Sequence, residues 1–428
     1  MVTVTKYAKE TFWAVAAKAA AFFFYYGLVY YLTRKMTVEV WGEWSAFLAL
    51  LNIILLISDQ GLNVAVKRYV SSARDSAELG GVVRVTFALR VLASLVFTLA
   101  IAFLIPPLLK LLGQPSYIPL LQRSLLLVAL YGMMEYFKYL FEALHRLRFT
   151  FVVTALEHGF KFLLVIILFR GGEQFVAIIL GFTVAVGIAF AAGLILTLRA
   201  IPSVFNSPVP ARIMRQTYFY SIPIFLMSIA GFISLEIDTI MLKSLRTDYE
   251  TGIYSVAKQI IMFLPHLSIA VSMGTIPGIA VFTESTAISQ RRLYYRVLGA
   301  IAAIYLLVSL GVAALALWGM DLFFRPEYHA ASAPLLALIP FAIFNAATIY
   351  SGNLMVYRGL AWQRSINVAL TVLANVLLNW WLIPMWGAIG AAIASSIAYL
   401  PYCILNLRAA HKAFAIPGAT DKGQQPLS

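Results

Sequence analysis

Long apolar runs with few charged positions follow one another along the whole chain. Residues 11–32, "TFWAVAAKAAAFFFYYGLVYYL", form one such run, and its single charge is Lys18. About 20 apolar residues are what a helix needs to cross the hydrocarbon core of a bilayer. The runs do not alternate apolar and polar residues at period two, which excludes the strands of a transmembrane barrel. The pattern therefore predicts an all-α polytopic membrane protein.

We expect about twelve transmembrane helices, separated by short polar segments and by breaks that contain proline or glycine. The last two are divided by a tight turn within "IPMWGAIGAA". The predicted spans are 11–33, 42–63, 82–105, 118–139, 150–169, 174–198, 217–241, 252–280, 294–318, 332–353, 364–384 and 387–407.

Two short segments of the chain resemble each other at an offset of 210 residues. "TVEVWGEWSAF" (37–47) aligns with "TDYETGIYSVA" (247–257), matching Gly42 with Gly252. This repeat predicts two six-helix bundles related by an axis along the membrane normal. The predicted parts are an N-terminal bundle, a cytoplasmic linker rich in proline and arginine, a C-terminal bundle and a cytoplasmic tail, at 1–198, 199–216, 217–407 and 408–428.

The charged residues indicate how the chain lies in the membrane. Only 12% of the residues are charged, against about a quarter in soluble proteins. Of the lysines and arginines in the predicted loops, 19 lie on the side of the N-terminus and 7 on the other. Because cytoplasmic loops carry the excess of such residues, both termini are expected in the cytoplasm and the protein in the cytoplasmic (inner) membrane. These residues stand singly at span ends, so we expect no nucleic-acid partner despite the net charge of +14.

Several classes of function lack their sequence signals. The one cysteine, Cys403, and the scattered histidines have no metal-ligand spacing, so no metal site is expected. The chain has no Gly-rich phosphate loop of the G-x-x-x-x-G-K type. The loops are too short for the acidic or histidine clusters of membrane glycosyltransferases. We therefore expect a carrier with no catalytic residues rather than an enzyme.

Three stretches resemble polysaccharide flippases of the multidrug/oligosaccharidyl-lipid/polysaccharide exporter superfamily. They are "YLTRKMTVEVWGEWSAFLALLNIILLISDQGLNVAVKRYVSSA" (31–73), "SIPIFLMSIAGFISLEIDTIMLKSLRTDYETGIYSVAKQI" (221–260) and "NVLLNWWLIPMWGAIGAAIASSIAY" (375–399). The resemblance implies two bundles around a central cavity that opens alternately to the two sides. The polysaccharide branch moves isoprenoid-diphosphate-linked oligosaccharides to the outer leaflet. The multidrug branch exchanges cationic drugs for protons or sodium.

Three cations lie within predicted spans, where an unpaired charge is costly and usually faces water or a partner. They are Lys18, Arg90 and Lys258. Each long side chain has the alternative of reaching back to the interface. In the family the first, seventh and eighth spans line the cavity, and two of the cations fall on these spans. Our hypothesis is that Lys18 and Lys258, with Arg90, bind the phosphates of the substrate.

The acids within spans leave two interpretations open. Glu236 and Asp238 either pair with a lysine, Lys258 or Lys243, or bind a coupling proton or sodium ion; pairing is favoured. Glu157 and Lys161 are four residues apart, so they are expected to neutralise each other on one helix face. A second such pair is expected between Glu135 and Lys138.

The sequence thus predicts a flippase for lipid-linked oligosaccharide in surface polysaccharide or glycan assembly, working by alternating access. Its expected partners are this substrate, membrane lipid and polysaccharide assembly proteins. The first alternative is a multidrug antiporter of the same superfamily driven by protons or sodium. A non-transporting membrane scaffold and a glycan polymerase are the remaining alternatives.

Overall fold

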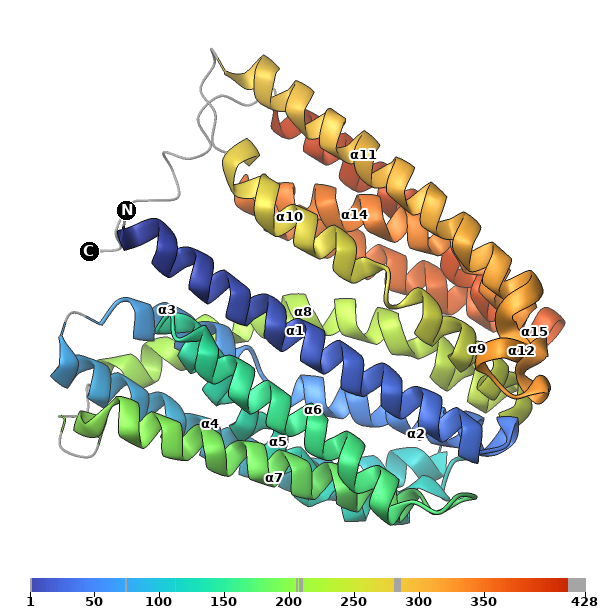
Figure 1. Cartoon of the computed structure of the whole chain (residues 1–428), viewed down its shortest axis with the longest axis horizontal. Helices are drawn as coiled ribbons and strands as arrows, with labels where there is room; N and C mark the ends of the chain where they lie inside the picture. Colours follow the sequence, from blue (N-terminus) through green and yellow to red (C-terminus); the bar gives the residue numbers. More distant parts are fainter. Residues whose placement is uncertain are drawn as a thin grey trace. The chain divides into compact units, whose positions relative to one another are not determined.

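Every regular element that the computed structural model describes is a helix (Figure 1). The structure describes residues 2–73, 75–111, 113–204, 207, 211–280 and 286–414. The chain forms two compact units. Unit 1 comprises Met1–Met36 and Leu50–Ile229, and unit 2 comprises Thr37–Ala49 and Ala230–Ser428. The predicted linker 199–216 and tail 408–428 lie partly outside the described residues, and the predicted bundle boundaries stay a prediction.

Unit 1 is built from long helices joined by short turns. Its closest packing is between α1 and α6, between α6 and α7, and between α5 and both α4 and α7. The helices are α1 (Val2–Lys35), α2 (Val38–Ile57), α3 (Leu62–Ser71), α4 (Ser76–Leu111), α5 (Tyr117–Ala143), α6 (Leu147–Leu168), α7 (Phe175–Ala200), η1 (Pro202–Val204) and the first part of α8 (Ala211–Leu245).

Unit 2 contains the start of α2, the end of α8 and all later elements. Within it α14 packs against α15, α10 and α11, and Figure 1 shows α10 beside α14. The elements are α9 (Asp248–Ile261), α10 (Pro265–Ala280), α11 (Ala287–Ala314), η2 (Leu315–Gly319), α12 (Met320–Phe323), η3 (Pro326–Ala331), α13 (Ser332–Ala337), α14 (Ile339–Tyr357) and α15 (Ala361–Ala413).

Ten helical segments of the described chain are long and apolar enough to cross a membrane. The predicted all-α membrane architecture is confirmed. The prediction of twelve spans also counts α8, which is not among the ten, and divides α15 in two. At Gly387 of α15 the backbone is not helical, with φ 55° and ψ −128°, within the tight turn expected from the sequence. The exact count of twelve stays a prediction.

Two of the predicted spans contain a break. Between α2 and α3 the backbone enters the left-handed region at Gln60 and Gly61, with φ of 50° and 70°. A Cβ on Gly61 would overlap the carbonyl oxygen of Ser221, so glycine is required there for both reasons. Between α9 and α10 the chain turns before Pro265, which cannot donate the hydrogen bond that a continuous helix needs. The predicted spans 42–63 and 252–280 ran through these breaks.

The two aligned segments of the repeat pack against each other inside unit 2. A Cβ on Gly42 of α2 would overlap the carbonyl oxygen of Asp248, and a Cβ on Gly252 of α9 would overlap that of Val38. Val38 and Asp248 are themselves separated by 210 residues, like the two glycines. The contact is therefore reciprocal, as it is at an interface of two equivalent copies. This geometry supports the duplication inferred from the sequence.

Candidate functional site

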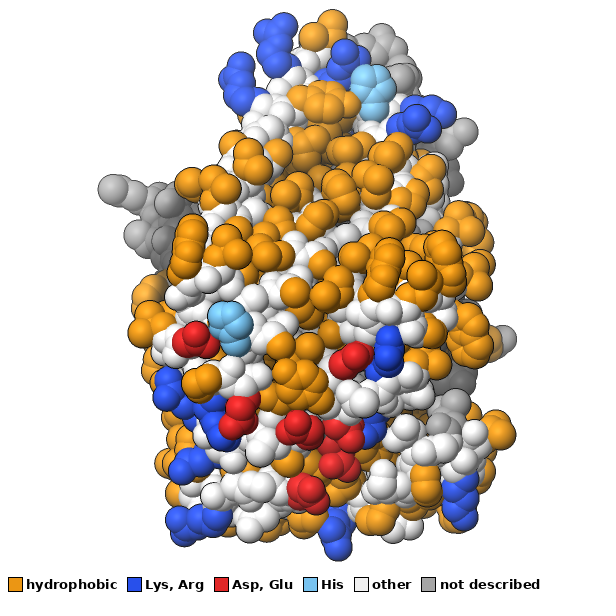
Figure 2. All heavy atoms as spheres, turned by 90° about the vertical axis from the view of Figure 1, so that its right-hand side faces the viewer, with side chains coloured by type: hydrophobic (Ala, Val, Ile, Leu, Met, Phe, Trp, Pro, Cys, Tyr) orange, Lys and Arg blue, Asp and Glu red, His pale blue; other side chains and the backbone are white. Residues whose placement is uncertain are grey.

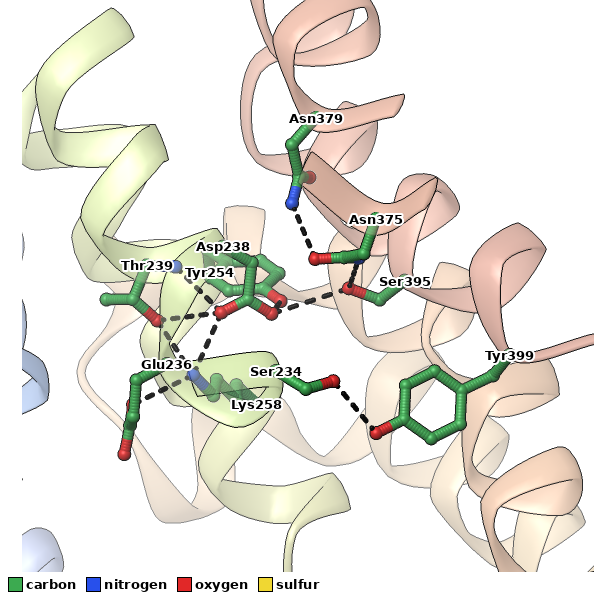
Figure 3. Close-up of polar contacts among 10 residues, drawn as sticks. All are labelled: Ser234, Glu236, Asp238, Thr239, Tyr254, Lys258, Asn375, Asn379, Ser395 and Tyr399. Atoms are coloured by element: carbon green, nitrogen blue, oxygen red, sulfur yellow. Dashed lines mark hydrogen bonds and ion pairs between the residues drawn. The ribbon is translucent and has the colours of Figure 1, made fainter. Parts of the chain in front are cut away.

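A buried polar network in unit 2 surrounds the ammonium group of Lys258 on α9 (Figure 3). Its Nζ donates to Glu236 Oε2 at 3.0 Å, to Asp238 Oδ1 at 3.0 Å and to Thr239 Oγ1 at 2.9 Å. An ammonium group has three donors, so all three are used. Lys258 is only 8% exposed. The alternative in which this lysine reaches back to the membrane interface does not fit these contacts.

The Asp238 carboxylate is the hub of the network. Its Oδ1 accepts from Lys258 and from the backbone N–H of Thr239, the latter at 2.7 Å. Its Oδ2 accepts from the hydroxyls of Tyr254 and Ser395. These donors come from α8, α9 and α15, so one carboxylate joins three helices. The buried charge is stabilised because each of its oxygens has several donors.

Two asparagines extend the network along α15. The Asn379 amide donates to Asn375 Oδ1 at 2.9 Å, and the Asn375 amide donates to Ser395 Oγ at 3.3 Å. The bend at Gly387 lets Ser395 on the second arm of α15 face Asn375 on the first. The Oδ1 of Asn379, itself 0% exposed, has no hydrogen-bond partner among the described residues. The network thus ends on an unused acceptor.

The formal charge of the unit 2 network is negative, because it holds two carboxylates and one ammonium group. The carboxylates differ in how far the protein covers them: the Glu236 side chain is 23% exposed and that of Asp238 is 6% exposed. No group of three or more metal-ligating side chains occurs among the described residues.

Unit 1 contains a second charged network with the opposite arrangement. Glu157 on α6, 2% exposed, accepts from Lys138 Nζ and from Lys161 Nζ, each at 2.5 Å. Lys138 also binds Glu135 at 2.6 Å. The two predicted pairs, Glu157–Lys161 and Glu135–Lys138, are therefore confirmed. The bond from Lys138 to Glu157 joins them into one network with no net charge.

Lys18 lies at the level of this network in unit 1. The ring of Trp13 contacts that of Phe151, and Tyr31 donates to the carbonyl oxygen of Phe169, in each case 138 residues apart. Helices α1 and α6 therefore run in parallel, and Lys18 lies beside the turn of α6 that carries Glu157. Lys18 is exposed. Among the described residues none of the ion pairs includes it.

Arg90 of α4 binds the backbone at the break between α2 and α3. Its guanidinium donates to the carbonyl oxygens of Ser58 at 3.0 Å, Asp59 at 2.9 Å and Gly132 at 2.7 Å. The residue is 1% exposed, and a Cβ on Gly132 would overlap the guanidinium. The contacts with Ser58 and Asp59 satisfy carbonyls that the broken helix leaves without partners, and the contact with Gly132 ties the break to α5. They favour a structural role for Arg90 over the expected contact with a phosphate.

The three cations that the sequence grouped together have different surroundings within their own units. Lys18 is exposed in unit 1, Lys258 is enclosed by Glu236 and Asp238 in unit 2, and Arg90 is used by backbone carbonyls. Sequence reasoning missed the other members of the unit 2 network. The available signal was the spacing of Asn375 and Asn379, two amides one turn apart in an otherwise apolar span.

Comparison with solved structures defines the class of fold. The chain has the fold of an inward-facing multidrug resistance MATE family transporter of the MOP superfamily, with a TM-score of 0.70, 14% identity and coverage of 93% of this chain and 96% of that one. The lipid II flippase MurJ in an inward closed conformation gives a TM-score of 0.71 at 12% identity, covering 95% of this chain and 89% of that one. A MATE transporter of Vibrio cholerae gives 0.65 at 15% identity, covering 96% and 99%.

The chain belongs to the family described as polysaccharide biosynthesis protein, whose model matches residues 7–282. No curated protein matches the chain in sequence. The family match and the shared fold confirm the resemblance drawn from the three sequence stretches.

Proposed function

We propose that this protein is a flippase that moves an isoprenoid-diphosphate-linked oligosaccharide across the cytoplasmic membrane by alternating access. Membership of a polysaccharide biosynthesis family supports the substrate class. A fold shared with a lipid II flippase and with drug transporters supports transport rather than an enzymatic reaction. Both termini face the cytoplasm, as the distribution of lysine and arginine indicates.

The observation that carries the proposal is that Lys18 is exposed beside the unit 1 network, whose two lysines are already paired with two acids. The positive charges of Lys138 and Lys161 are neutralised by Glu135 and Glu157, so that Lys18 is the excess cation of this layer. Two opposite charges about 4 Å apart attract by roughly 4 kcal/mol at an intermediate effective dielectric constant. This attraction offsets part of the several kcal/mol that a phosphate loses with its water.

Lys258 has a different role in this proposal. Its ammonium is bonded to Glu236, Asp238 and Thr239, so it is not free to bind a phosphate while the network is intact. We propose that the network couples transport to an ion, with Asp238 and Glu236 accepting a proton or a sodium ion. Neutralisation of one carboxylate would weaken the hold on Lys258 and release its ammonium toward the substrate.

The experiment that tests the function uses purified full-length protein in vesicles and a fluorescent, defined lipid-linked oligosaccharide. We expect the protein to make the labelled head group accessible to a membrane-impermeant quencher from the opposite side. Vesicles without protein are the control for spontaneous movement. Equal quenching with and without protein would refute the flippase.

A multidrug antiporter is the second candidate, and the negative charge of the unit 2 network favours it. An excess carboxylate is suited to a cationic drug as well as to a coupling ion. The same vesicles, loaded with a cationic dye, distinguish the two functions. Dye efflux driven by a proton or sodium gradient, with no movement of the lipid-linked oligosaccharide, would replace the flippase by the antiporter.

Coupling is tested separately by imposing gradients on the oligosaccharide assay. We expect a proton or a sodium gradient to accelerate wild-type transport and to have little effect on Asp238→Asn or Glu236→Gln. Transport that responds only to the membrane potential would remove the coupling role. Moving one charge through 100 mV releases about 2.3 kcal/mol, which is sufficient to drive a doubly charged head group outward.

A further inference from the structure

A basic surface lies at one end of unit 2, where α11 begins and α15 ends. Arg291, Arg292 and Arg296 of α11 are exposed, as are Arg408 and Lys412 of α15. On the face drawn in Figure 2, Lys and Arg side chains gather around a His at this end. The first turn of α11 contains no acidic residue.

The two helix ends are fixed to each other by aromatic contacts. The Tyr295 hydroxyl and His411 Nδ1 are 2.7 Å apart, and the rings of Tyr294 and Phe414 are 5.4 Å apart. Arg291 and Arg292 lie one helical turn before Tyr295, and Arg408 lies one turn before His411. Residues three or four apart share a helix face, so these arginines lie on the faces where the two helices meet.

The cations of this surface have no anionic partner in the described part of the chain. None of its ion pairs includes one of the five residues. Some cations on the corresponding predicted side of unit 1 differ: Lys67 binds Glu142, and Arg146 donates to the Ala200 carbonyl oxygen at 3.4 Å. Arg148 lies over the Phe149 ring, 4.7 Å from its centroid. An anion from outside the chain would complete the unit 2 surface.

Large apolar side chains accompany the cations. Ile288 is 75% exposed, Leu293 is 42% exposed and Tyr295 is 40% exposed, all within the first turns of α11. A helix end that presents both apolar and basic side chains is suited to the boundary between acyl chains and lipid head groups. The partner is therefore expected to combine a negative charge with an acyl chain.

We propose that this surface, formed by Arg291, Arg292, Arg296, Arg408 and Lys412, is a binding site for an anionic phospholipid of the surrounding bilayer. The phosphate of the head group lies between the starting turns of α11 and the last turns of α15. The acyl chains lie along Ile288 and Leu293. The site is distinct from the networks around Lys258 and Glu157, and its occupation does not require transport.

The test titrates short-chain phosphatidylglycerol into the purified full-length protein and follows the midpoint of thermal unfolding. The variant Arg291→Gln/Arg292→Gln/Arg408→Gln is compared with a matched control, Arg146→Gln/Arg148→Gln/Arg199→Gln, whose three arginines are also exposed. Each basic residue near an anionic surface contributes about fivefold in affinity, so the first variant should bind roughly 100-fold more weakly. The control should retain wild-type affinity.

Two further measurements use the wild-type protein only, so they test the site even if the triple variant does not fold. They also identify the ligand. Phosphatidylcholine and inorganic phosphate, each at the same concentration, should leave the wild-type midpoint unchanged, because one lacks net charge and the other lacks acyl chains. Salt at about 1 M, where the screening length is about 3 Å, should remove the effect of phosphatidylglycerol on the wild type. Equal losses in the two triple variants, equal stabilisation by inorganic phosphate, or an effect that resists salt would overturn the proposal.

Discussion

The charged networks of the two units have opposite arrangements. In unit 1 an acid, Glu157, lies between two cations, and in unit 2 a cation, Lys258, lies between two acids. The first is neutral once Glu135 is included, and the second keeps a negative charge. The difference teaches that a buried charge is held by two opposite charges in both units, with the signs reversed.

The two networks are not inherited copies of one ancestral site. At the offset of 210 residues that aligns the repeat, Lys258 corresponds to Leu48. What the copies share is the crossing of Gly42 and Gly252, where backbone meets backbone. The two aligned segments therefore share their packing geometry and differ at the position of this charge.

Removal of the central cation in unit 2 should have the largest effect. Lys258→Met leaves Glu236 and Asp238 side by side without their counter-ion, and loss of one partner of a buried pair costs about 4 to 5 kcal/mol. We expect a large fall in the thermal midpoint of the purified protein. The triple variant Lys258→Met/Asp238→Asn/Glu236→Gln should recover most of it. A triple variant as unstable as Lys258→Met would contradict the charge-based explanation.

Removal of the central acid in unit 1 should cost less. Glu157→Gln leaves Lys161 without an acid, whereas Lys138 keeps Glu135 at 2.6 Å, so we expect a loss of about 3 kcal/mol. Chemical unfolding in mixed micelles measures it. Glu157→Gln/Lys161→Gln should be more stable than Glu157→Gln alone. If Glu157→Gln proved more damaging than Lys258→Met, the proposed difference between the networks would be wrong.

The shared glycine crossing should respond to a single methyl group. Gly42→Ala and Gly252→Ala each force a Cβ against a backbone carbonyl, and overpacking of this kind costs about 2 kcal/mol. Gly274→Ala is the matched control, because a Cβ there meets no atom within 4 Å. The same unfolding measurement should show losses for the first two and none for the control. Tolerance of alanine at both crossing positions would remove the structural support for the duplication.

Loss of the Lys18 charge should have the smallest effect on stability. Lys18 is exposed and forms none of the ion pairs in the described chain, so Lys18→Ala should stay within about 0.5 kcal/mol of the wild type. Unfolding of this variant beside Glu157→Gln compares an exposed cation with a buried acid in the same layer. A loss of unfolding free energy as large as that of Glu157→Gln would show that Lys18 belongs to the unit 1 network around Glu157.

The sequence predicted the architecture because transmembrane helices are specified by local composition. Apolar runs of sufficient length identified the spans, and the tight turn at Gly387 followed from glycine and proline. The predicted spans ran through the breaks after Ile57 and Ile261. The second break lies among apolar residues, whereas the first falls on the polar residues Ser58, Asp59 and Gln60, which were placed at the end of span 42–63. Their conformation depends on tertiary contacts, such as the approach of Gly61 to Ser221.

The candidate site was predictable only in part, for a related reason. Pairs four residues apart, such as Glu157 and Lys161, can be read from a helix face, and pairing of Asp238 with Lys258 was one of two stated alternatives. Arg90 donates its shortest hydrogen bonds to backbone carbonyls, which carry no sequence signal, and its ion pair with Asp59 at 3.5 Å joins residues 31 positions apart. The place of Ser395 beside Asp238 depends on how the second arm of α15 packs after the turn at Gly387, and the predicted turn alone does not define that packing.

The most direct test of the account measures flipping of the labelled lipid-linked oligosaccharide by Lys18→Ala, Lys18→Arg and the wild type in the same vesicles. Lys110→Ala, which removes an exposed lysine near the end of α4, is the control. We predict that Lys18→Ala loses roughly tenfold or more in rate, equivalent to about 1.4 kcal/mol, while Lys18→Arg and Lys110→Ala stay near the wild type. Wild-type flipping by a stable, correctly inserted Lys18→Ala protein would contradict the claim that this cation receives the phosphate.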